Sequence, residues 1–377
     1  MKKRKFYILV WNFSYGSASS NRLLAYANSA VEFGYDVEIV ALLRLDLKNC
    51  QPRKSVKIRG LYSCKLQNKI ISKLLSFFTT LWFLMATVNS EDRILLYGSA
   101  EYLPFCIFCR KKQLFFEVTE CPDLFPPRTY PFWIYKKLWK KLNGIFVISN
   151  NLKYYFIKHG VASDKVHVIN MIVETSRFEG LKRNPTVVPY IAYCGNINKD
   201  SKDGVGDLIK SFVLYHRIFP DRKLYIIGPI VSREQKEEYD DYLKSCNIFD
   251  FVVFTGSVSP FEIPQYLVDA EMLVLARPDN LQAKYGFPTK LGEYLLSGRP
   301  VVVTNVGNIC DFLIDGQSAY IAKPGDINDI SSKMIEISKN EFLATRVGGK
   351  GKISALTFFD CMRETVKLLS IMFKINN

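Results

Sequence analysis

The chain has 377 residues, of which 48% are hydrophobic and 23% are charged, and its formal net charge is +15. The length suggests two domains, and the composition is a normal globular mix with enough apolar residues for two cores. Nine cysteines, an odd number without regular spacing, argue against a disulfide framework and favour a reduced, cytoplasmic chain.

The positive charge is concentrated in one half of the sequence. Residues 1–180 contain 27 Lys and Arg against 13 Asp and Glu, whereas the remainder contains 24 against 23. Such a field favours an anionic partner: membrane lipid, nucleic acid or a phosphorylated substrate. Only the positive charge favours nucleic-acid binding. The aromatic residues lie mostly in apolar runs and not between exposed lysines, as a nucleic-acid-binding surface would require. We therefore expect no nucleic-acid partner.

The first residues are basic and are followed by an apolar run, residues 6–13. This pattern resembles the start of a signal peptide, but the run is short, contains Asn12 and precedes no small-residue cleavage site. A buried strand at residues 6–11 is the better interpretation. A loop of small residues, a helix at 21–33 that ends at Gly34, and a second strand at 37–42 complete a right-handed βαβ unit of a parallel sheet. Four more strands are expected in this half, at residues 93–97, 113–116, 144–148 and 166–169.

Residues 70–88 are unusually apolar and approach the length of about 20 residues that spans a bilayer. Lys73 and the Ser and Thr residues of the run argue against a spanning helix. A helix packed on the sheet is the favoured interpretation, and an interfacial helix that dips into a membrane stays open. A basic amphipathic helix at residues 134–143 allows either an ordinary solvated face or contact with a membrane surface. Cys106 and Cys109 have apolar flanks and no second pair at zinc-ribbon spacing, so we expect a structural role for them.

A linker is expected at residues 177–189, followed by a second series of alternating strands and helices. The predicted strands are 190–194, 223–227, 252–255, 272–276 and 301–304, and the predicted helices are 205–215, 234–245, 260–270, 290–296 and 327–338. The pattern predicts an α/β chain of two doubly wound domains facing across a cleft, with ligands beyond the carboxyl ends of the strands. We expect an N-terminal domain at 1–178, a C-terminal domain at 179–355, and a terminal helix at 356–377 that crosses back to the N-terminal domain.

Residues 285–300 are the most informative stretch. A loop with Gly286 and Pro288 enters a helix near Thr289, and the helix stops at Gly298 before a buried Val-Val-Val-Thr strand. The free backbone N–H groups and the helix dipole at such an N-terminus form a seat for phosphate. One turn further, Glu293 can accept hydrogen bonds from vicinal hydroxyls. A diphosphate next to a ribose, as in a nucleotide-sugar, fits this arrangement.

With these segments the chain resembles the family 4 glycosyltransferases, which have the GT-B fold of two Rossmann-like domains. The resemblance covers essentially the whole chain and is strongest over residues 190–330. Besides 285–300, it is carried by Tyr-Cys-Gly-Asn at 193–196, Lys-Asp-Gly at 202–204, Leu-Tyr-Ile-Ile-Gly at 224–228, Val-Val-Phe-Thr-Gly at 252–256, Ile-Asp-Gly at 314–316 and Ala-Lys-Pro-Gly-Asp at 322–326. The resemblance implies retaining transfer from a nucleotide-diphosphate sugar, a UDP-sugar or a GDP-sugar, without an obligatory metal or other cofactor.

The family signature is a pair of glutamates separated by seven residues, and the chain keeps only the second. Glu293 matches the glutamate that holds the ribose hydroxyls, whereas Tyr285 stands where the other would contact the donor sugar. Lys202 matches the family lysine at the diphosphate, but Asn196 takes the place of the family arginine. Arg277 and Lys290 are the candidates to replace that lost positive charge.

Other expected site residues lie near the carboxyl ends of predicted strands. Gly16, in the first loop, allows the backbone to approach the donor phosphates or the acceptor. No histidine follows the strand at 113–116, where many relatives carry a His-Glu pair; Glu117 or Glu120 could instead bind a sugar, and Glu120 is preferred. The expected catalytic residues are Glu120, Glu117, Lys202 and Arg277. The expected donor-binding residues are Gly16, Gly195, Asn196, Lys202, Val258, Arg277, Tyr285, Gly286, Phe287, Pro288, Thr289, Lys290, Leu291 and Glu293.

In the expected mechanism the leaving diphosphate acts as base toward the incoming hydroxyl, so no dedicated nucleophile is needed. Lys202, Arg277, Lys290 and backbone amides of the 287–291 segment would stabilise the developing negative charge. The sequence lacks the Asp-x-Asp of metal-dependent transferases, the phosphate-binding loop of NTPases and an intact Gly-x-Gly-x-x-Gly. The alternative is a non-catalytic, membrane-docked protein of the same fold that binds a nucleotide-sugar or saccharide.

The basic N-terminal half suggests the acceptor. A saccharide linked to a lipid pyrophosphate, at the inner face of a membrane, would account for both the positive charge and the apolar run at 70–88. We therefore expect a cytoplasmic protein, peripheral on an anionic membrane surface, with a role in bacterial surface polysaccharide synthesis.

Overall fold

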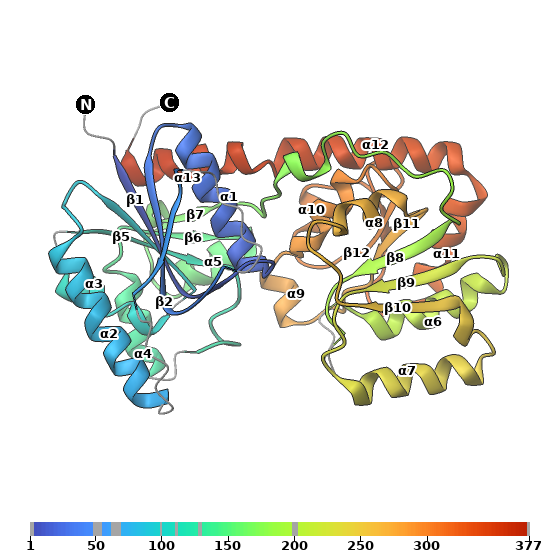
Figure 1. Ribbon diagram of the computed structural model, residues 1–377, viewed down its shortest axis with the longest axis horizontal. Helices are drawn as coiled ribbons and strands as arrows, with labels where there is room; N and C mark the ends of the chain where they lie inside the picture. The colour runs from blue at the N-terminus through green and yellow to red at the C-terminus, as the bar shows by residue number, and fades with distance from the viewer. Residues whose placement is uncertain are drawn as a thin grey trace. The chain divides into compact units, whose positions relative to one another are not determined.

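The computed structural model describes residues 4–47, 55–61, 69–98, 100–109, 112–126, 130–197 and 203–374. The predicted site residue Lys202 lies outside these ranges. The chain divides into two compact units, hereafter unit 1, residues 1–172 with 361–377, and unit 2, residues 173–360. Each unit is built on its own parallel sheet (Figure 1).

Unit 1 has a seven-stranded sheet in the order β3-β2-β1-β4-β5-β6-β7, and every neighbouring pair is parallel. The strands are β1 (Lys5–Ser14), β2 (Asp36–Asp46), β3 (Lys57–Gly60), β4 (Arg93–Tyr97), β5 (Gln113–Val118), β6 (Gly144–Val147) and β7 (Val166–Val168). The helices are α1 (Ala18–Glu32), α2 (Lys69–Ala86), α3 (Phe105–Phe108), α4 (Phe132–Trp139), α5 (Asn150–Lys158) and α13 (Cys361–Phe373). The central strands are continuous apolar runs because helices cover a parallel sheet on both faces.

Local signals explain where α1 begins and ends. The side chain of Ser17 caps the first turn by accepting a hydrogen bond from the Ser20 amide. The helix is followed by Gly34, whose φ of 82° a residue with a side chain rarely adopts. The last helix, α13, packs against α1, and its residues Leu368, Leu369 and Met372 complete the core of unit 1.

Unit 2 has a six-stranded parallel sheet in the order β10-β9-β8-β11-β12-β13. The strands are β8 (Tyr190–Cys194), β9 (Lys223–Ile227), β10 (Val252–Gly256), β11 (Met272–Leu275), β12 (Val301–Thr304) and β13 (Tyr320–Ala322). The helices are α6 (Val205–His216), α7 (Arg233–Ser245), α8 (Ile263–Asp269), α9 (Leu281–Tyr285), α10 (Thr289–Leu296), α11 (Ile327–Lys339) and α12 (Glu341–Phe358). The predicted fold class, two Rossmann-like α/β domains in one chain, is confirmed.

The C-terminal helices differ from the prediction. One terminal helix within 356–377 was expected, but the chain forms α12 and α13, with a break at Phe359 and Asp360. The break is fixed to unit 2, because the carbonyl of Phe359 accepts a hydrogen bond of 2.9 Å from the Val173 amide. The short strands β3 and β13 were not predicted either.

Two further expectations concern membranes and thiols. Within the described ranges, no helix is both long enough and apolar enough to cross a membrane, and this includes α2. Cys106 and Cys109 are buried free thiols, and burial raises the pKa of Cys106 to about 11.

Candidate functional site

The predicted site residues of unit 2 meet at the carboxyl edge of its sheet. From β8 the chain order continues to β9 on one side, whereas β11 lies on the other side, so the strand order reverses between β8 and β11. Ligands of open α/β sheets bind at such a switch point. Gly195 follows β8 and Arg277 follows β11, which places both residues at this edge.

A buried carboxylate, Asp203, organises two cations at this edge. It accepts hydrogen bonds from the Lys290 ammonium and from the Tyr193 hydroxyl, the latter at 2.9 Å, and Arg277 Nε lies 3.8 Å from its other oxygen. Burial alone would raise the pKa of the Asp203 carboxyl, but Lys290, Arg277 and Tyr193 outweigh burial and hold that pKa below its ordinary value. The three charged groups together carry an excess of one positive charge, which suits an anion.

Gly195 lets the chain pass close to these cations. A Cβ atom at this position would overlap the Lys290 ammonium and the Tyr193 hydroxyl. Any side chain larger than hydrogen would therefore displace the lysine from Asp203. The lysine ammonium also lies 5.2 Å from the Tyr193 ring centroid, a cation–π contact that helps to hold it in place.

The N-terminus of α10, where the sequence predicts a phosphate seat, lies in the same unit. Pro288 is the residue before the first turn and supplies no side-chain cap, and Thr289 is exposed. The Leu291 amide donates a 3.1 Å hydrogen bond to the Pro288 carbonyl, so this amide is engaged within the turn. Phe287 is buried and packs against the rings of Phe312 and Phe359, which fixes the entry of the chain into the helix.

Glu293, one turn into α10, forms an ion pair with Arg177. A second guanidinium nitrogen of Arg177 donates a 2.9 Å hydrogen bond to the Pro260 carbonyl. Both side chains are about a quarter exposed, at 23% for Arg177 and 26% for Glu293. The carboxylate is therefore held in a fixed orientation and is reachable from solvent.

The remaining predicted residues of unit 2 have varied environments. Gly286 and Pro288 are buried, Tyr285 at the end of α9 and Val258 after β10 are half-buried, and Asn196 is exposed. The position that corresponds to the family arginine thus presents an exposed amide and no charge.

In unit 1, the two predicted carboxylates have different surroundings. Glu117 is 1% exposed and forms an ion pair of 2.8 Å with Arg22, and it accepts a 2.9 Å hydrogen bond from the Tyr26 hydroxyl. Glu120 is half-buried beyond the end of β5. Gly16 is exposed in the loop after β1, with a φ of 89°, and its amide donates a 3.2 Å hydrogen bond to the Asn21 side chain.

In unit 2, three residues that contact the predicted side chains were not themselves predicted: Asp203, Tyr193 and Arg177. Asp203 and Tyr193 lie within motifs that the sequence singles out, so a search for buried polar residues beside the predicted lysines could find them. Arg177 falls in the predicted linker, 116 positions before its partner in the sequence, and no local pattern identifies it.

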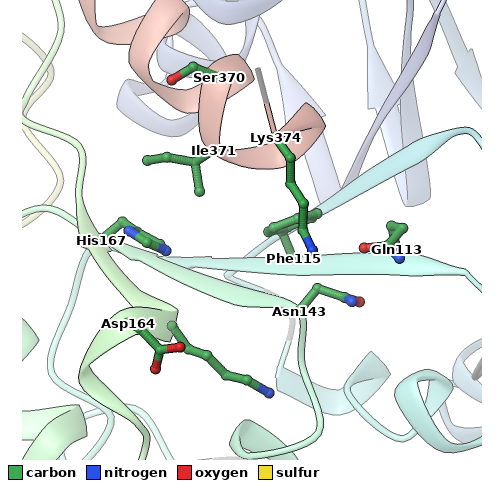
Figure 2. A pocket seen from close by; sticks show the side chains of 9 residues that line it. Gln113, Phe115, Asn143, Asp164, His167, Ser370, Ile371 and Lys374 are labelled. Atoms are coloured by element: carbon green, nitrogen blue, oxygen red, sulfur yellow. The ribbon is translucent and has the colours of Figure 1, made fainter. Parts of the chain in front are cut away.

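A cavity of about 590 Å³ lies at the opposite, amino edge of the unit 1 sheet. Figure 2 shows the side chains around it, which come from the starts of β5 and β7, the segments just before β6 and β7, and the end of α13. Its lining residues are Gln113, Phe115, Asn143, Asp164, Lys165, His167, Ser370, Ile371 and Lys374. It contains none of the predicted site residues. Among the residues that the structure describes, no group of three His, Cys, Asp or Glu side chains could hold a metal ion.

Two Rossmann-like units in one chain are the architecture of the GT-B fold. The Anabaena protein HepE, solved in complexes with UDP and with UDP-glucose, superposes with a TM-score of 0.74 at 14% identity and covers 98% of this chain and 100% of its own. This likeness shows the fold.

Residues 188–340 match the sequence family described as Glycosyl transferases group 1. An uncharacterized glycosyltransferase of Methanocaldococcus jannaschii is 23% identical over 55% of this chain and 59% of its own length. The capsular polysaccharide biosynthesis glycosyltransferase CapM of Staphylococcus aureus is 24% identical over 55% of each chain. The chain thus spans somewhat more than half the length of these curated relatives.

Proposed function

We propose that this protein is a retaining glycosyltransferase of family 4 that transfers a sugar from a UDP- or GDP-sugar to a saccharide acceptor. The observation that carries the proposal is the pairing of Arg277 and Lys290 around Asp203 at the carboxyl edge of unit 2. An excess positive charge, next to a helix N-terminus in the same unit, is what a leaving diphosphate requires. The complexes of HepE with UDP and UDP-glucose support a nucleotide-sugar donor for the same fold.

In the proposed donor complex, the diphosphate binds Arg277, Lys290 and amides at the start of α10. Lys202, from the sequence match, adds a third cation. Glu293 accepts hydrogen bonds from the ribose hydroxyls, and Arg177 keeps its carboxylate in position. Tyr285 offers one hydroxyl near the donor sugar where the family has a carboxylate, so a different sugar preference is expected.

Transfer with retention would break the bond between the anomeric carbon and the diphosphate oxygen and form the new glycosidic bond on the same face of the sugar. The acceptor hydroxyl gives its proton to the leaving diphosphate. The protein then contributes mainly by placing the reactants and stabilising the developing charge. In unit 1 we assign sugar contact to Glu120, because Glu117 already forms a buried ion pair with Arg22.

We infer that the acceptor is carried on a lipid pyrophosphate at the cytoplasmic face of a membrane, in the synthesis of a surface polysaccharide. The supporting observations are the strongly basic sequence of unit 1 and the similarity to CapM, a glycosyltransferase of capsular polysaccharide biosynthesis.

The proposal is tested by incubating the protein with a panel of nucleotide-sugars and a lipid-linked saccharide fraction. We expect sugar transfer from one donor, with NMR showing the same anomeric configuration in donor and product. Glu293→Gln should weaken the thermal stabilisation by that donor by several-fold, whereas Glu336→Gln, an exposed carboxylate on α11, should not change it. Donor binding without any transfer would favour the non-catalytic alternative, and inverted product would exclude retention.

A further inference from the structure

Helix α2 exposes a stripe of large apolar side chains, although it also buries Phe83 and Leu84 against the protein. Six large apolar side chains are exposed: Ile71, Leu74, Leu75, Phe78, Trp82 and Met85. Their spacing of three, four and seven residues places them within one stripe along the helix. The stripe is strongly exposed at its centre and end, with 60% for Phe78, 71% for Trp82 and 65% for Met85.

Three polar side chains of α2 point toward the protein. Ser76 and Thr80 have no exposed surface, and Ser72 is buried as well. The Ser76 hydroxyl bonds the Leu42 carbonyl of β2 and the Tyr102 hydroxyl, each at 2.6 Å. The Thr80 hydroxyl donates a 2.6 Å hydrogen bond to the Ser76 carbonyl. The hydroxyl groups of Ser76 and Thr80 are therefore hydrogen-bonded. The bonds of Ser76 to β2 and Tyr102 hold this side of the helix inward, so the apolar stripe faces outward.

Helix α2 contacts α3, which in turn contacts α4. Phe77 of α2 and Phe105 of α3 have ring centroids 4.8 Å apart, and the thiol of Cys106 on α3 lies 4.0 Å from a carbonyl of α4. On these helices Phe108 and Trp133 are 60% and 58% exposed. Exposed large apolar side chains thus occur on all three of these packed helices, and groups of such side chains mark interaction sites.

The positive charge of unit 1 indicates which kind of partner binds this surface. Unit 1 has 29 Lys and Arg against 12 Asp and Glu in its sequence, whereas unit 2 has 22 against 24. Exposed Lys137, Lys140 and Lys141 lie on and just after α4, and the Lys137 ammonium lies 4.7 Å from the Trp133 ring centroid. An apolar stripe with a tryptophan and flanking lysines suits the boundary between acyl chains and anionic headgroups. A second copy of this chain would bring an equally basic unit against the first.

We propose that the outward face of α2, with Phe108 and Trp133, inserts into the interface of an anionic lipid bilayer. The helix lies along the membrane surface and does not cross it. The inference rests on and deepens the proposed function, since a lipid-linked acceptor would lie in the same membrane, but it stands on the α2 geometry and can be tested without sugar transfer.

The test is flotation of the full chain with phosphatidylcholine vesicles, with and without about 30% phosphatidylglycerol. The wild-type protein should float with the anionic vesicles, and added salt should weaken its binding. The double variant Phe78→Ser/Trp82→Ser should lose at least about tenfold in partitioning, because it removes two of the most exposed apolar side chains. Phe342→Ser, which removes a 77% exposed ring from α12 in unit 2, should bind like the wild type.

Three results would overturn the inference: no binding by the wild type, equal binding by the double variant, or a wild-type dimer in sedimentation velocity that the double variant makes monomeric. Thermal unfolding of the variants without vesicles checks that they fold. Stabilisation by UDP or GDP, measured on the same variants, should be unchanged. Lost vesicle binding with intact nucleotide binding thus separates this inference from the proposed transfer reaction.

Discussion

Asp203 connects the two cations of the candidate site, and its charge has a measurable effect on stability. Its carboxylate is buried and holds Lys290 and Arg277, so its pKa in the folded protein lies below that of the unfolded chain. The resulting stabilisation is fully present at a pH above the pKa of Asp203 in the unfolded chain, which is about 4. It is lost as the pH falls through the lower pKa of Asp203 in the folded protein.

We therefore expect Asp203→Asn to lower the free energy of unfolding at pH 7 by about 2–4 kcal/mol, because it leaves two cations without their carboxylate. The cost should shrink below about pH 4, because the unfolded wild-type chain then takes up a proton at Asp203, and the folded carboxyl does so at still lower pH. Urea unfolding of both proteins across this range measures the difference. Asp250→Asn, an exposed carboxylate, is the control. A cost that is independent of pH would mean that packing, and not charge, is what the substitution disturbs.

At the level of single residues, the sequence indicated which side chains suit the proposed ligand, but it did not indicate which other residues those side chains contact. Lys290, Arg277 and Glu293 were named because their residue types and their places after strands and in a helix suit a diphosphate and a ribose. Their contacts to Asp203 and Arg177 were not foreseen, because ion pairs between distant segments depend on tertiary packing. The pair of Glu117 with Arg22 has the same origin: the sequence places Glu117 near a strand end, but only the fold shows how deeply it is buried.

At the level of elements, α10 supplies the helix N-terminus that we propose as the phosphate seat. Its first turn has no acidic residue and no side-chain cap, so the dipole and the amide groups at this end have no competing anion from the helix itself. A carboxylate introduced at Thr289 should stabilise the helix and compete with a bound diphosphate.

We expect Thr289→Asp to raise the free energy of unfolding by about 0.3–1 kcal/mol and to weaken UDP or GDP binding roughly tenfold. Opposite signs for the two effects distinguish a ligand seat from an ordinary helix end. Thermal unfolding and calorimetric titration of the same preparation measure them, with Thr289→Ser as the matched control. Unchanged nucleotide affinity would remove the helix N-terminus from the site.

The strands were the most predictable elements, since buried apolar runs between turn residues mark them clearly. Four of them, β4, β8, β9 and β12, have the predicted bounds. Helix α12 was largely missed, because the glycines at 348, 349 and 351 lower helix propensity by about 1 kcal/mol each. The structure gives the reason for Gly348: a Cβ atom there would overlap the backbone of Gly298 and lie 2.7 Å from the Arg299 carbonyl carbon, where α12 passes the end of α10. β3 is short and largely exposed and therefore lacks the apolar signal.

At the level of the whole molecule, the chain ends in the unit in which it begins. The carboxylate of Glu364 in α13 accepts a 2.8 Å hydrogen bond from the Asn170 amide, and Arg93 donates a 2.7 Å bond to the Met372 carbonyl. Leu368 is fully buried in the core of unit 1. The final helix is thus a structural part of unit 1, although all of unit 2 precedes it in the sequence.

Leu368→Ala should therefore destabilise unit 1 by about 2–5 kcal/mol through the cavity that it leaves. Hydrogen exchange should show faster opening in β1, β2 and α1, whereas amides of β8, β11 and α10 keep their protection. Val366→Ala, an exposed position on the same helix, should change neither unit. Equal loosening of both sheets would show that the two units unfold as one.

The central claim is that the carboxyl edge of unit 2 binds a nucleoside diphosphate through its cations. The most direct test is calorimetric titration of UDP and GDP into the wild-type protein, Lys290→Met and the exposed control Lys210→Met. We predict that the wild type and Lys210→Met bind one of the two nucleotides equally well. Lys290→Met should bind it at least about tenfold more weakly, because one charge-assisted contact is worth about 1.5–3 kcal/mol. Failure of the wild type to bind either nucleotide, or equal affinity for Lys290→Met, would contradict the account.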